Sequence, residues 1–387
     1  MKVVVLAPAY VPAHKAGGPV PGIVGAVESL AGHQVQVLTA DRDLGDTRPY
    51  PLPHVGTVDV DGTPVTYLAP PGWGSLRAWF VALGAIRSAD VVYANSVMSK
   101  TFTVLPVLVL LLTRWRGRLL VSPRGELAAS AMVLGSSWQK RAWTGFLRRS
   151  GAARALGGRP AVWVVSSERE EADVHRVFPG ARTALVPERL RQVAGATRGS
   201  RPPRSEGLRV VTVGRVAPVK GIDDLVRGLA HVRTPVRLDV LGLLEDASHV
   251  ALVRALVDQL PEHVDVRLVG AVPPTEVEAH LRASHLFALL TRGENFGHAI
   301  GEALRAGCPV LISDQTPWSN VQDSGAGVVL DPAACASPDA VGAAVQAFAD
   351  MDDPAWDAWS QRATARAARV TGGSTLADVL DVQHDDI

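Results

Sequence analysis

Short runs of β-branched and leucine residues recur along this chain, and segments with helical spacing of their apolar residues separate them. The first run, at 2–6, is followed by a glycine-containing loop, by four apolar residues at helical spacing between Ile23 and Leu30, and by a second run at 35–38. Continuous apolar runs of this length are typical of strands buried on both faces of a parallel sheet. The alternation predicts an α/β protein with an open parallel sheet.

The same alternation continues through both halves of the chain. Asp61-Gly62 is a common signal for a tight hairpin, with Asp59 and Asp61 expected on one face of it. Further strands are predicted at 58–60, 63–65, 91–93, 119–121 and 162–165 in the first half, and at 209–213, 237–241, 266–269, 286–290, 309–312 and 328–330 in the second.

The composition changes between Arg198 and Gly207, where a polar, proline-broken stretch is suited to an interdomain linker. We therefore expect an N-terminal Rossmann-like domain at 1–188, a linker at 189–207 and a second Rossmann-like domain at 208–355. A helical C-terminal segment at 356–387 is expected to cross back to the N-terminal domain. Ligands of such sheets bind at the carboxyl ends of the strands, so two facing domains would place a site in the cleft between them.

Charge and cysteine content exclude several classes of protein. Lysine and arginine number 39 against 38 acidic residues, so the chain lacks the general attraction to phosphate backbones that nucleic-acid binders show. The two cysteines, Cys308 and Cys335, form neither a disulfide framework nor a zinc-ligand pattern. Prolines interrupt the N-terminal apolar run before a signal-peptide core could form. These features predict a cytoplasmic protein.

The longest apolar run, at 102–113, covers about a dozen residues where a membrane span needs about twenty. It is expected to form a buried helix. Arg114, Trp115, Arg116 and Arg118 follow it directly, and basic and aromatic residues beside an apolar run leave peripheral membrane contact as an alternative.

Two segments of the second half carry residue types suited to binding an anion. Gly214-Arg215 follows the strand at 209–213, and Lys220-Gly221 then opens a helix, so two cations could converge on one anion beside helix amides. Taken alone, this pattern fits solvated surface charges equally well.

The second segment follows the strand at 286–290. Glu294 lies in its loop, and Glu302 lies about one and a half turns into the helix expected from Gly297. The amides of that helix would point at the loop, and each carboxylate can accept two hydroxyl hydrogen bonds, which suits the vicinal diols of a ribose or hexose. Alone, each glutamate is more often an ordinary surface acid.

Together these segments resemble glycosyltransferase family 4, whose members are retaining nucleotide-sugar transferases with the two-domain GT-B fold. The resemblance rests on the Gly-Arg and Lys-Gly pairs, on the two glutamates separated by seven residues, and on the stretches 306–311, 316–318 and 324–327. It implies an α/β fold of two Rossmann-like domains facing across a cleft.

The resemblance also implies roles for these residues. Arg215 and Lys220 would bind the donor diphosphate and neutralise the departing charge, while Glu294 would face the transferred sugar; these three are the predicted catalytic residues. Glu302 would hold the ribose hydroxyls. The other residues expected to contact the donor are Gly17, Gly18, Gly214, Asn295, Phe296, Gly297 and His298.

The first half resembles exopolysaccharide-type members of the family. Small residues at Gly17-Gly18 would let the backbone approach a phosphate or an acceptor. The predicted acceptor-side residues are Asn95, Arg124 and Glu126, although a local ion pair is an equal alternative for the last two. Asn95 stands where many relatives carry histidine, and Pro187-Glu188 replaces a common Pro-Asn.

The expected reaction moves a hexose from a nucleotide diphosphate donor, a UDP-sugar being favoured, to an acceptor hydroxyl with retention. No metal or other cofactor is expected. A small-molecule acceptor, as in bacterial natural-product biosynthesis, is favoured over a polysaccharide or lipid-linked glycan. We expect Trp318 near the donor.

Other classes of protein remain as alternatives. Asp-x-Asp strings of metal-dependent transferases occur at 41–43, 59–61 and 350–352, but none lies in a nucleotide-binding strand–helix context. A dinucleotide oxidoreductase is disfavoured because the first strand–helix turn lacks Gly-x-Gly-x-x-Gly. A nucleotide-sugar epimerase or hydrolase, or a nucleotide-sugar-binding protein without catalysis, would share the same cations and carboxylates.

Overall fold

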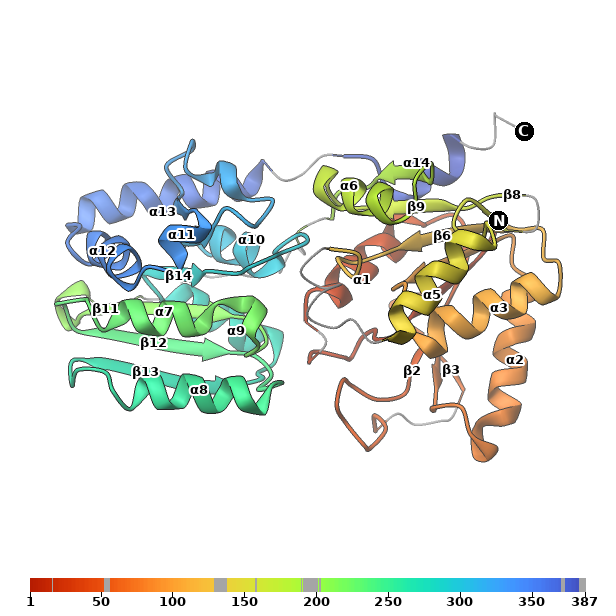
Figure 1. Cartoon of the computed structure of the whole chain (residues 1–387), viewed down its shortest axis with the longest axis horizontal. Coiled ribbons are helices and arrows are strands. Elements are labelled where there is room, and N and C mark those ends of the chain that lie inside the picture. Colours follow the sequence, from red (N-terminus) through yellow and green to blue (C-terminus); the bar gives the residue numbers. More distant parts are fainter. Residues whose placement is uncertain are drawn as a thin grey trace. The chain divides into compact units, whose positions relative to one another are not determined.

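A computed structural model of the chain describes residues 1–15, 17–51, 56–128, 138–156, 159–188, 190, 201, 203–369 and 373–382 (Figure 1). The chain divides into two compact units. Unit 1 comprises Met1–Arg189 with Gly373–Ile387, and unit 2 comprises Leu190–Gly372. The predicted C-terminal segment at 356–387 is thus shared between the units, because its first part stays with unit 2.

Unit 1 is built on a sheet whose described strands follow the order β10-β9-β6-β5-β1-β2-β4-β3. All neighbours are parallel except β3 and β4, which form the predicted hairpin. Asp59 lies in β3, but Asp61 lies in the turn with φ 51°, so the two do not share a strand face. The strands are β1 (Lys2–Ala7), β2 (Gln34–Ala40), β3 (Thr57–Val60), β4 (Thr63–Leu68), β5 (Val91–Asn95), β6 (Arg118–Ser122), β9 (Val162–Val165) and β10 (Arg182–Leu185).

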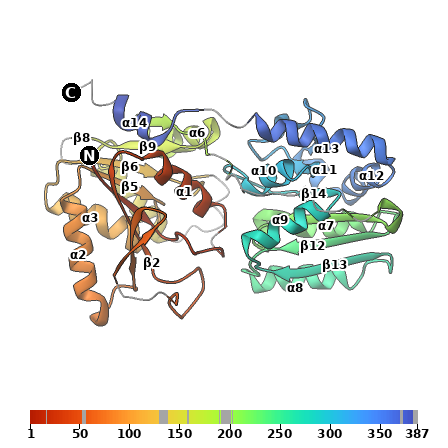
Figure 2. The same cartoon turned by 180° about the vertical axis from the view of Figure 1, so that it is seen from behind.

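Both faces of this sheet are covered, as its apolar strands predict. In β1, Val4 and Leu6 pack into one core and Val3 and Val5 into the other. Figure 1 shows α5 in front of the sheet, and Figure 2, from behind, shows α1 in front. The helical elements are α1 (Pro19–Ser29), η1 (Trp73–Ser75), α2 (Leu76–Arg87), η2 (Lys100–Val104), α3 (Leu105–Leu112), α5 (Trp138–Arg149), α6 (Glu168–Val177) and α14 (Leu376–Val382); a short ribbon pairs β7 (Ala155–Leu156) with β8 (Arg159–Pro160).

The end of the chain is tied to unit 1 by hydrogen bonds as well as by packing. The buried Arg118 guanidinium donates to the carbonyls of Leu380, at 3.1 Å, and Val379, at 3.3 Å. Leu376, Val379 and Leu380 lie in the same core as α1.

Unit 2 contains a fully parallel sheet with the order β13-β12-β11-β14-β15-β16 among its described strands. Its strands are β11 (Leu208–Val213), β12 (Val236–Leu241), β13 (Val264–Gly270), β14 (Leu286–Leu289), β15 (Val310–Ser313) and β16 (Gly327–Leu330). The helical elements are η3 (Arg204–Glu206), η4 (Pro218–Lys220), α7 (Ile222–Leu229), α8 (Ala247–Val257), α9 (Pro274–Ala283), α10 (His298–Arg305), η5 (Ser319–Val321), α11 (Pro332–Cys335), α12 (Pro338–Ala349) and α13 (Asp353–Ala368).

The two sheets share one winding pattern. Numbered along the chain, the strands of the unit 2 sheet run 3-2-1-4-5-6. Those of the large sheet in unit 1 run 3-2-1-4-5-6-7 once the antiparallel β3 is set aside. In this doubly wound order the strand order reverses between β1 and β5, and between β11 and β14. Ligands of such folds bind outside the carboxyl ends of the strands at this reversal.

The predicted buried helix at 102–113 is helical, but its burial is one-sided. A turn of π-helix at η2 leads into α3, whose Pro106, Val107 and Leu110 are buried. Leu108 and Leu112 lie on the other face and are 36% and 83% exposed. The prediction of full burial is therefore wrong for the outer face. Within the described residues, no helix combines the length and the apolar character needed to cross a bilayer.

Candidate functional site at the strand reversal of unit 2

The reversal between β11 and β14 brings Lys220 and Glu294 together. Lys220 ends the turn η4 after β11, and Glu294 lies in the loop after β14. Its Nζ donates to Oε2 of Glu294 at 2.5 Å, and both side chains keep about one sixth of their surface exposed, at 15% and 17%. The lysine stem passes over Gly214, where an added Cβ would meet it at 3.5 Å. The contact between these two segments is thus formed by a cation and a carboxylate that solvent still reaches.

Two glycines with left-handed backbone allow the loops to approach this closely. Gly221 has φ 63°, and a Cβ there would collide with the carbonyl oxygen of Leu290 at the end of β14. Gly297 has φ 78°, and a Cβ there would press on Glu294 at 3.2 Å and Ile300 at 3.0 Å. Only glycine adopts such backbone without strain.

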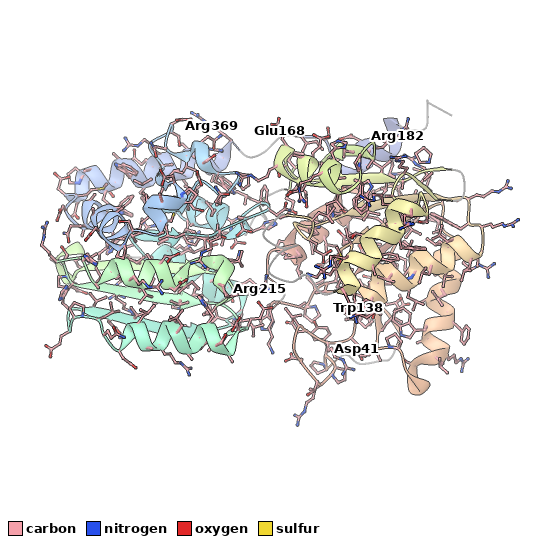
Figure 3. The ribbon with its side chains drawn as sticks, in the orientation of Figure 1. Asp41, Trp138, Glu168, Arg182, Arg215 and Arg369 are labelled. Atoms are coloured by element: carbon pink, nitrogen blue, oxygen red, sulfur yellow. The ribbon has the colours of Figure 1, made fainter. Side chains whose placement is uncertain are left out.

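Arg215 lies apart from the lysine–glutamate pair. Its guanidinium binds both oxygens of Glu245, at 2.7 and 2.6 Å, and its side chain is 42% exposed (Figure 3). Glu245 follows β12, on the other side of β11 from Glu294. The two predicted cations therefore hold different carboxylates instead of converging on a shared one.

Helix α10 starts directly behind the Glu294 loop, as predicted. Gly297 is its N-cap residue, and no side chain caps it. Its first-turn amides therefore keep the partial positive charge of a helix N-terminus. Asn295 and Glu302 are half-buried, and His298 is buried with its ring 4.7 Å from that of Phe296.

Trp318 belongs to the core beneath this loop and not to its accessible side, contrary to the expectation that it lies near a ligand. It is 3% exposed, and its Nε1 donates to the carbonyl of Phe296 at 2.5 Å. Phe296 is itself buried, with its ring 5.9 Å from the indole. These two aromatic residues thus support the loop through packing.

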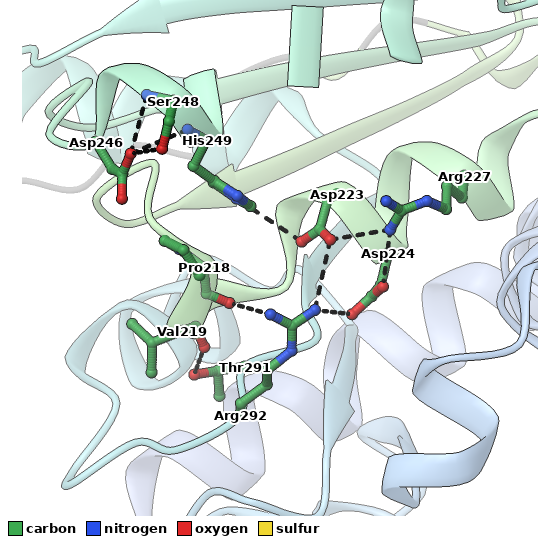
Figure 4. Close-up of polar contacts among 10 residues, drawn as sticks. All are labelled: Pro218, Val219, Asp223, Asp224, Arg227, Asp246, Ser248, His249, Thr291 and Arg292. Carbon is green, nitrogen blue, oxygen red and sulfur yellow. Dashed lines mark hydrogen bonds and ion pairs between the residues drawn. The ribbon is translucent and has the colours of Figure 1, made fainter. Parts of the chain in front are cut away.

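Sequence reasoning missed Arg292, which fastens the two loops together (Figure 4). Its guanidinium donates to the carbonyl of Pro218 at 2.7 Å and to Asp224 at 2.8 Å, and its amide donates to the carbonyl of Val219 at 2.7 Å. The hydroxyl of Thr291 donates to that same Val219 carbonyl at 3.0 Å. Lys220 is thus held in place by main-chain bonds from the Glu294 loop. The sequence feature that could have indicated this role is the arginine two residues before Glu294.

Asp223 of α7 also contacts Arg292, and we call this link between the two loops the Arg292 clamp. It accepts from Arg227 at 2.9 Å and from Arg292 at 3.4 Å, and it lies 3.7 Å from the buried His249 ring (Figure 4). Burial alone would raise the pKa of Asp223, but the hydrogen bond from Arg227 and the charges of Arg292 and His249 hold that pKa below its usual value. His249 is positioned by Asp246, whose carboxylate accepts from its amide at 3.0 Å.

In unit 1, the predicted glycines lie at the corresponding reversal. Gly17 and Gly18 follow β1 and are exposed, and Gly18 is the N-cap residue of α1, which has no side-chain cap. Gly17 has φ 68°, with open space where a Cβ would lie. The structure therefore offers exposed backbone at the predicted place.

The predicted acceptor-side arginine is buried in a network. Arg124 forms an ion pair with Glu188 and donates to Oδ1 of Asn95 at 2.8 Å and to the Tyr93 hydroxyl at 3.3 Å. Arg124 and Glu188 keep 9% and 7% of their side-chain surface exposed. Glu188, the departure from the common Pro-Asn, is thus the counter-charge of Arg124. Nδ2 of the buried Asn95 has no hydrogen-bond partner among the described residues.

Glu126 organises the loop after β5. Its carboxylate accepts from the Ser96 hydroxyl at 2.8 Å and from the amides of Val97 at 2.5 Å and Met98 at 3.0 Å. Glu170 does the same for the neighbouring loop, accepting from the Gly125 amide at 2.7 Å. Burial raises the pKa of both carboxyls. Both oxygens of Glu126 are engaged within the protein, which favours the local alternative considered for this residue.

Comparison with known proteins places a catalytic domain family on unit 2. Residues 196–366 match the family model "Glycosyl transferases group 1". The chain is 28% identical over 230 residues to a Mycobacterium tuberculosis GDP-mannose-dependent alpha-(1-6)-phosphatidylinositol monomannoside mannosyltransferase, which covers 55% of this chain and 60% of the relative. It therefore spans less than two thirds of that relative's length.

A second relative is matched over more of its length. The GDP-mannose:cellobiosyl-diphosphopolyprenol alpha-mannosyltransferase of Xanthomonas campestris is 27% identical over 285 residues, which is 70% of this chain and 68% of the relative. Among solved structures, Anabaena Alr3699/HepE in complex with UDP and glucose superposes with a TM-score of 0.69 at 15% identity, over 100% of this chain and 99% of that one. The chain has a GT-B-like fold of two Rossmann-like units, and its residues 196–366 are similar to the glycosyl transferases group 1 family.

Proposed function

We propose that this chain is a glycosyltransferase that moves a sugar from a nucleotide diphosphate donor to an acceptor hydroxyl. One observation carries the proposal: Lys220 and Glu294 meet, solvent-accessible, at the strand reversal of unit 2, beside the uncapped N-terminus of α10. This position in a doubly wound sheet is where such folds bind nucleotides. The match of residues 196–366 to a glycosyltransferase family supports it.

In the proposed reaction, the bond between the sugar C1 and the diphosphate oxygen breaks while the acceptor oxygen bonds to C1. The acceptor proton passes to the departing diphosphate, so no protein base is required. Lys220, Arg215 and the amides of Gly297 and His298 stabilise the charge that develops on the diphosphate, because preorganised donors in a partly buried site need no reorganisation during reaction. The proposed reaction proceeds with retention and without a metal or other cofactor.

The remaining donor contacts are assigned by chemistry. Glu302 would accept hydrogen bonds from ribose hydroxyls, and Glu294, released from Lys220 by the diphosphate, would accept from the sugar. Asn295, Phe296 and Gly214 would line this side of the donor. Gly17 and Gly18 would contribute backbone from unit 1.

For the donor, a UDP-sugar follows from the family resemblance, whereas the mannosyltransferase relatives are named for GDP-mannose. For the acceptor, the small-molecule hypothesis stands beside the lipid-linked or glycan alternative, which the names of both relatives favour. Asn95 has an unused donor on the acceptor side, while Arg124 and Glu126 act there by shaping the loops.

The proposal is tested by measuring product formation with a donor, in the presence and in the absence of an acceptor. The purified chain is screened by thermal shift against UDP and GDP, then incubated with UDP-glucose or GDP-mannose, with and without a panel of sugar, phenolic and polyprenyl-phosphate acceptors. Mass spectrometry should find glycosylated acceptor only when both substrates are present. Full donor turnover without acceptor would identify a hydrolase or epimerase, and binding without product would identify a nucleotide-sugar-binding protein.

A further inference from the structure

The outer faces of α2 and α3 expose large apolar side chains. Phe80 and Val81 of α2 are 72% and 69% exposed, and Leu112 of α3 is 83% exposed, with Leu108 one turn before it at 36%. We call these four residues the α2–α3 face. The opposite sides of the same helices are buried in the core, through Trp79, Ala82, Ile86, Val107 and Leu110. Clustered exposed side chains of this size mark an interaction surface.

The two helices lie together in unit 1. They are in direct contact, and the Trp79 ring of α2 lies 5.8 Å from Phe102 in the turn that leads into α3. Figure 1 and Figure 2 both show α2 and α3 side by side. The α2–α3 face therefore belongs to two neighbouring helices of unit 1.

Arginines border this face, and acids are missing from it. Arg77 and Arg87 are exposed at the two ends of α2, and Arg114 and Arg116 are exposed directly after α3. Between 76 and 118 the sequence holds six basic residues and a single acid, Asp90, in a chain with a net charge of only +1. In the part of the chain that the structure describes, none of these four arginines forms an ion pair. The positive charge is local and uncompensated.

We propose that the α2–α3 face docks on the surface of an anionic lipid bilayer. Apolar side chains between arginines, without acids, match the two layers of such a surface: aromatic and aliphatic groups enter the boundary of headgroups and acyl chains, and guanidinium groups bind lipid phosphates. Phe80, Val81 and Leu112 are the inserted residues, and Arg77, Arg87, Arg114 and Arg116 contact the headgroups. This inference goes beyond the proposed function and does not depend on it.

The test is sedimentation of the full chain with vesicles. Vesicles of phosphatidylcholine alone are compared with vesicles containing about one third phosphatidylglycerol, over a series of NaCl concentrations. Binding is expected to the anionic vesicles and to weaken steeply with salt, because the arginine contribution is screened. Brominated lipid should quench the tryptophan fluorescence of a bound Phe80→Trp variant more strongly than that of the bound wild-type chain. The reason is that the new indole would lie in the bilayer boundary, whereas Trp79 is buried.

Paired variants separate the apolar and the electrostatic parts. Phe80→Ser with Leu112→Ser, and Arg114→Glu with Arg116→Glu, should each lower the vesicle partition coefficient about tenfold. The control pair is Leu252→Ser with Arg254→Glu on α8 of unit 2, where the leucine is 41% exposed and the arginine is also exposed. All these positions are on the surface, so the thermal transition should stay close to that of the wild type.

Three results would overturn the proposal. One is failure of the wild-type chain to sediment with anionic vesicles at low salt. Another is equal loss of binding in the α8 control pair. The third is a wild-type dimer in light scattering that the Phe80→Ser and Leu112→Ser variant converts to a monomer, which would assign the face to a second copy of this chain. Each readout is independent of transferase activity.

Discussion

Charged residues follow the central strands of both units, but they are arranged in opposite ways. In unit 1, Arg124 and Glu188 are buried, with less than a tenth of either side chain exposed. In unit 2, Lys220 and Glu294 keep 15% and 17% of their surface, and Arg215 keeps 42%. A buried pair is fixed by the fold, whereas an accessible pair can exchange its counter-ion for a ligand. We propose that the more accessible pair of unit 2 contacts a ligand and that the pair of unit 1 supports its loops.

The largest effect should come from breaking the buried pair. Arg124→Ala removes the counter-charge of the largely buried Glu188, which we expect to lower the free energy of unfolding by about 3–5 kcal/mol. Urea unfolding followed by circular dichroism measures this. Arg215→Ala is the matched control, because its pair with Glu245 is exposed and should cost no more than about 1 kcal/mol. Equal losses of unfolding free energy in the two variants would contradict the difference that we draw between the two ion pairs.

The accessible pair should matter for turnover instead of stability. In the proposed reaction Lys220 stabilises the departing diphosphate, so we expect Lys220→Ala to lower kcat about 100-fold, equivalent to about 3 kcal/mol. Steady-state kinetics with the donor identified by screening would show it, with unfolding measured on the same sample. Wild-type turnover in this variant would remove Lys220 from the proposed chemistry.

A smaller effect is expected from the second glutamate. Glu302→Ala should weaken donor affinity about tenfold while leaving kcat nearly unchanged, because the proposed hydrogen bonds to the ribose would persist throughout the reaction. Calorimetric titration with the nucleoside diphosphate gives the affinity. Loss of kcat with unchanged affinity would instead place Glu302 at the reacting centre.

The smallest effect concerns the clamp. Arg292→Ala releases the Pro218 carbonyl and Asp224, and should reduce kcat/KM about fivefold by loosening the turn that carries Lys220. Arg292→Lys keeps the positive charge but lacks the planar guanidinium that donates to both the Pro218 carbonyl and Asp224. It should therefore recover activity only in part. Full activity in the alanine variant would show that the loop backbone holds Lys220 unaided.

The open parallel α/β architecture followed from the sequence because strands such as β9 (VWVV) and β14 (LFAL) are uninterrupted apolar runs. Such runs located the ends of β11 and β14, but the contact between Lys220 and Glu294 was not predicted. Strand β10 was not predicted, since Arg182–Leu185 lacks such a run. The outward face of α3 was also missed, because Leu108 and Leu112 are as apolar as the buried Leu110. Composition does not record which side of an apolar helix meets the core.

The partners of the charged residues are the second feature that the sequence did not predict. The sequence placed charges after strands but not the partners that bury them, so Arg124 and Glu126 resembled ligand-binding residues although Glu188 and the amides of Val97 and Met98 occupy them. It likewise did not indicate that Arg215 pairs with Glu245 or that Lys220 pairs with Glu294. Such pairings depend on contacts between residues far apart in sequence, which spacing alone does not encode.

The most direct test of the account is calorimetric titration of UDP and of GDP into the wild-type chain, the Lys220→Ala variant and a Lys100→Ala variant at an exposed lysine of unit 1. The account predicts that one nucleotide binds the wild type and the Lys100 variant equally well and binds the Lys220 variant at least tenfold more weakly. Equal affinity in all three proteins, with the Lys220 variant folded, would contradict it.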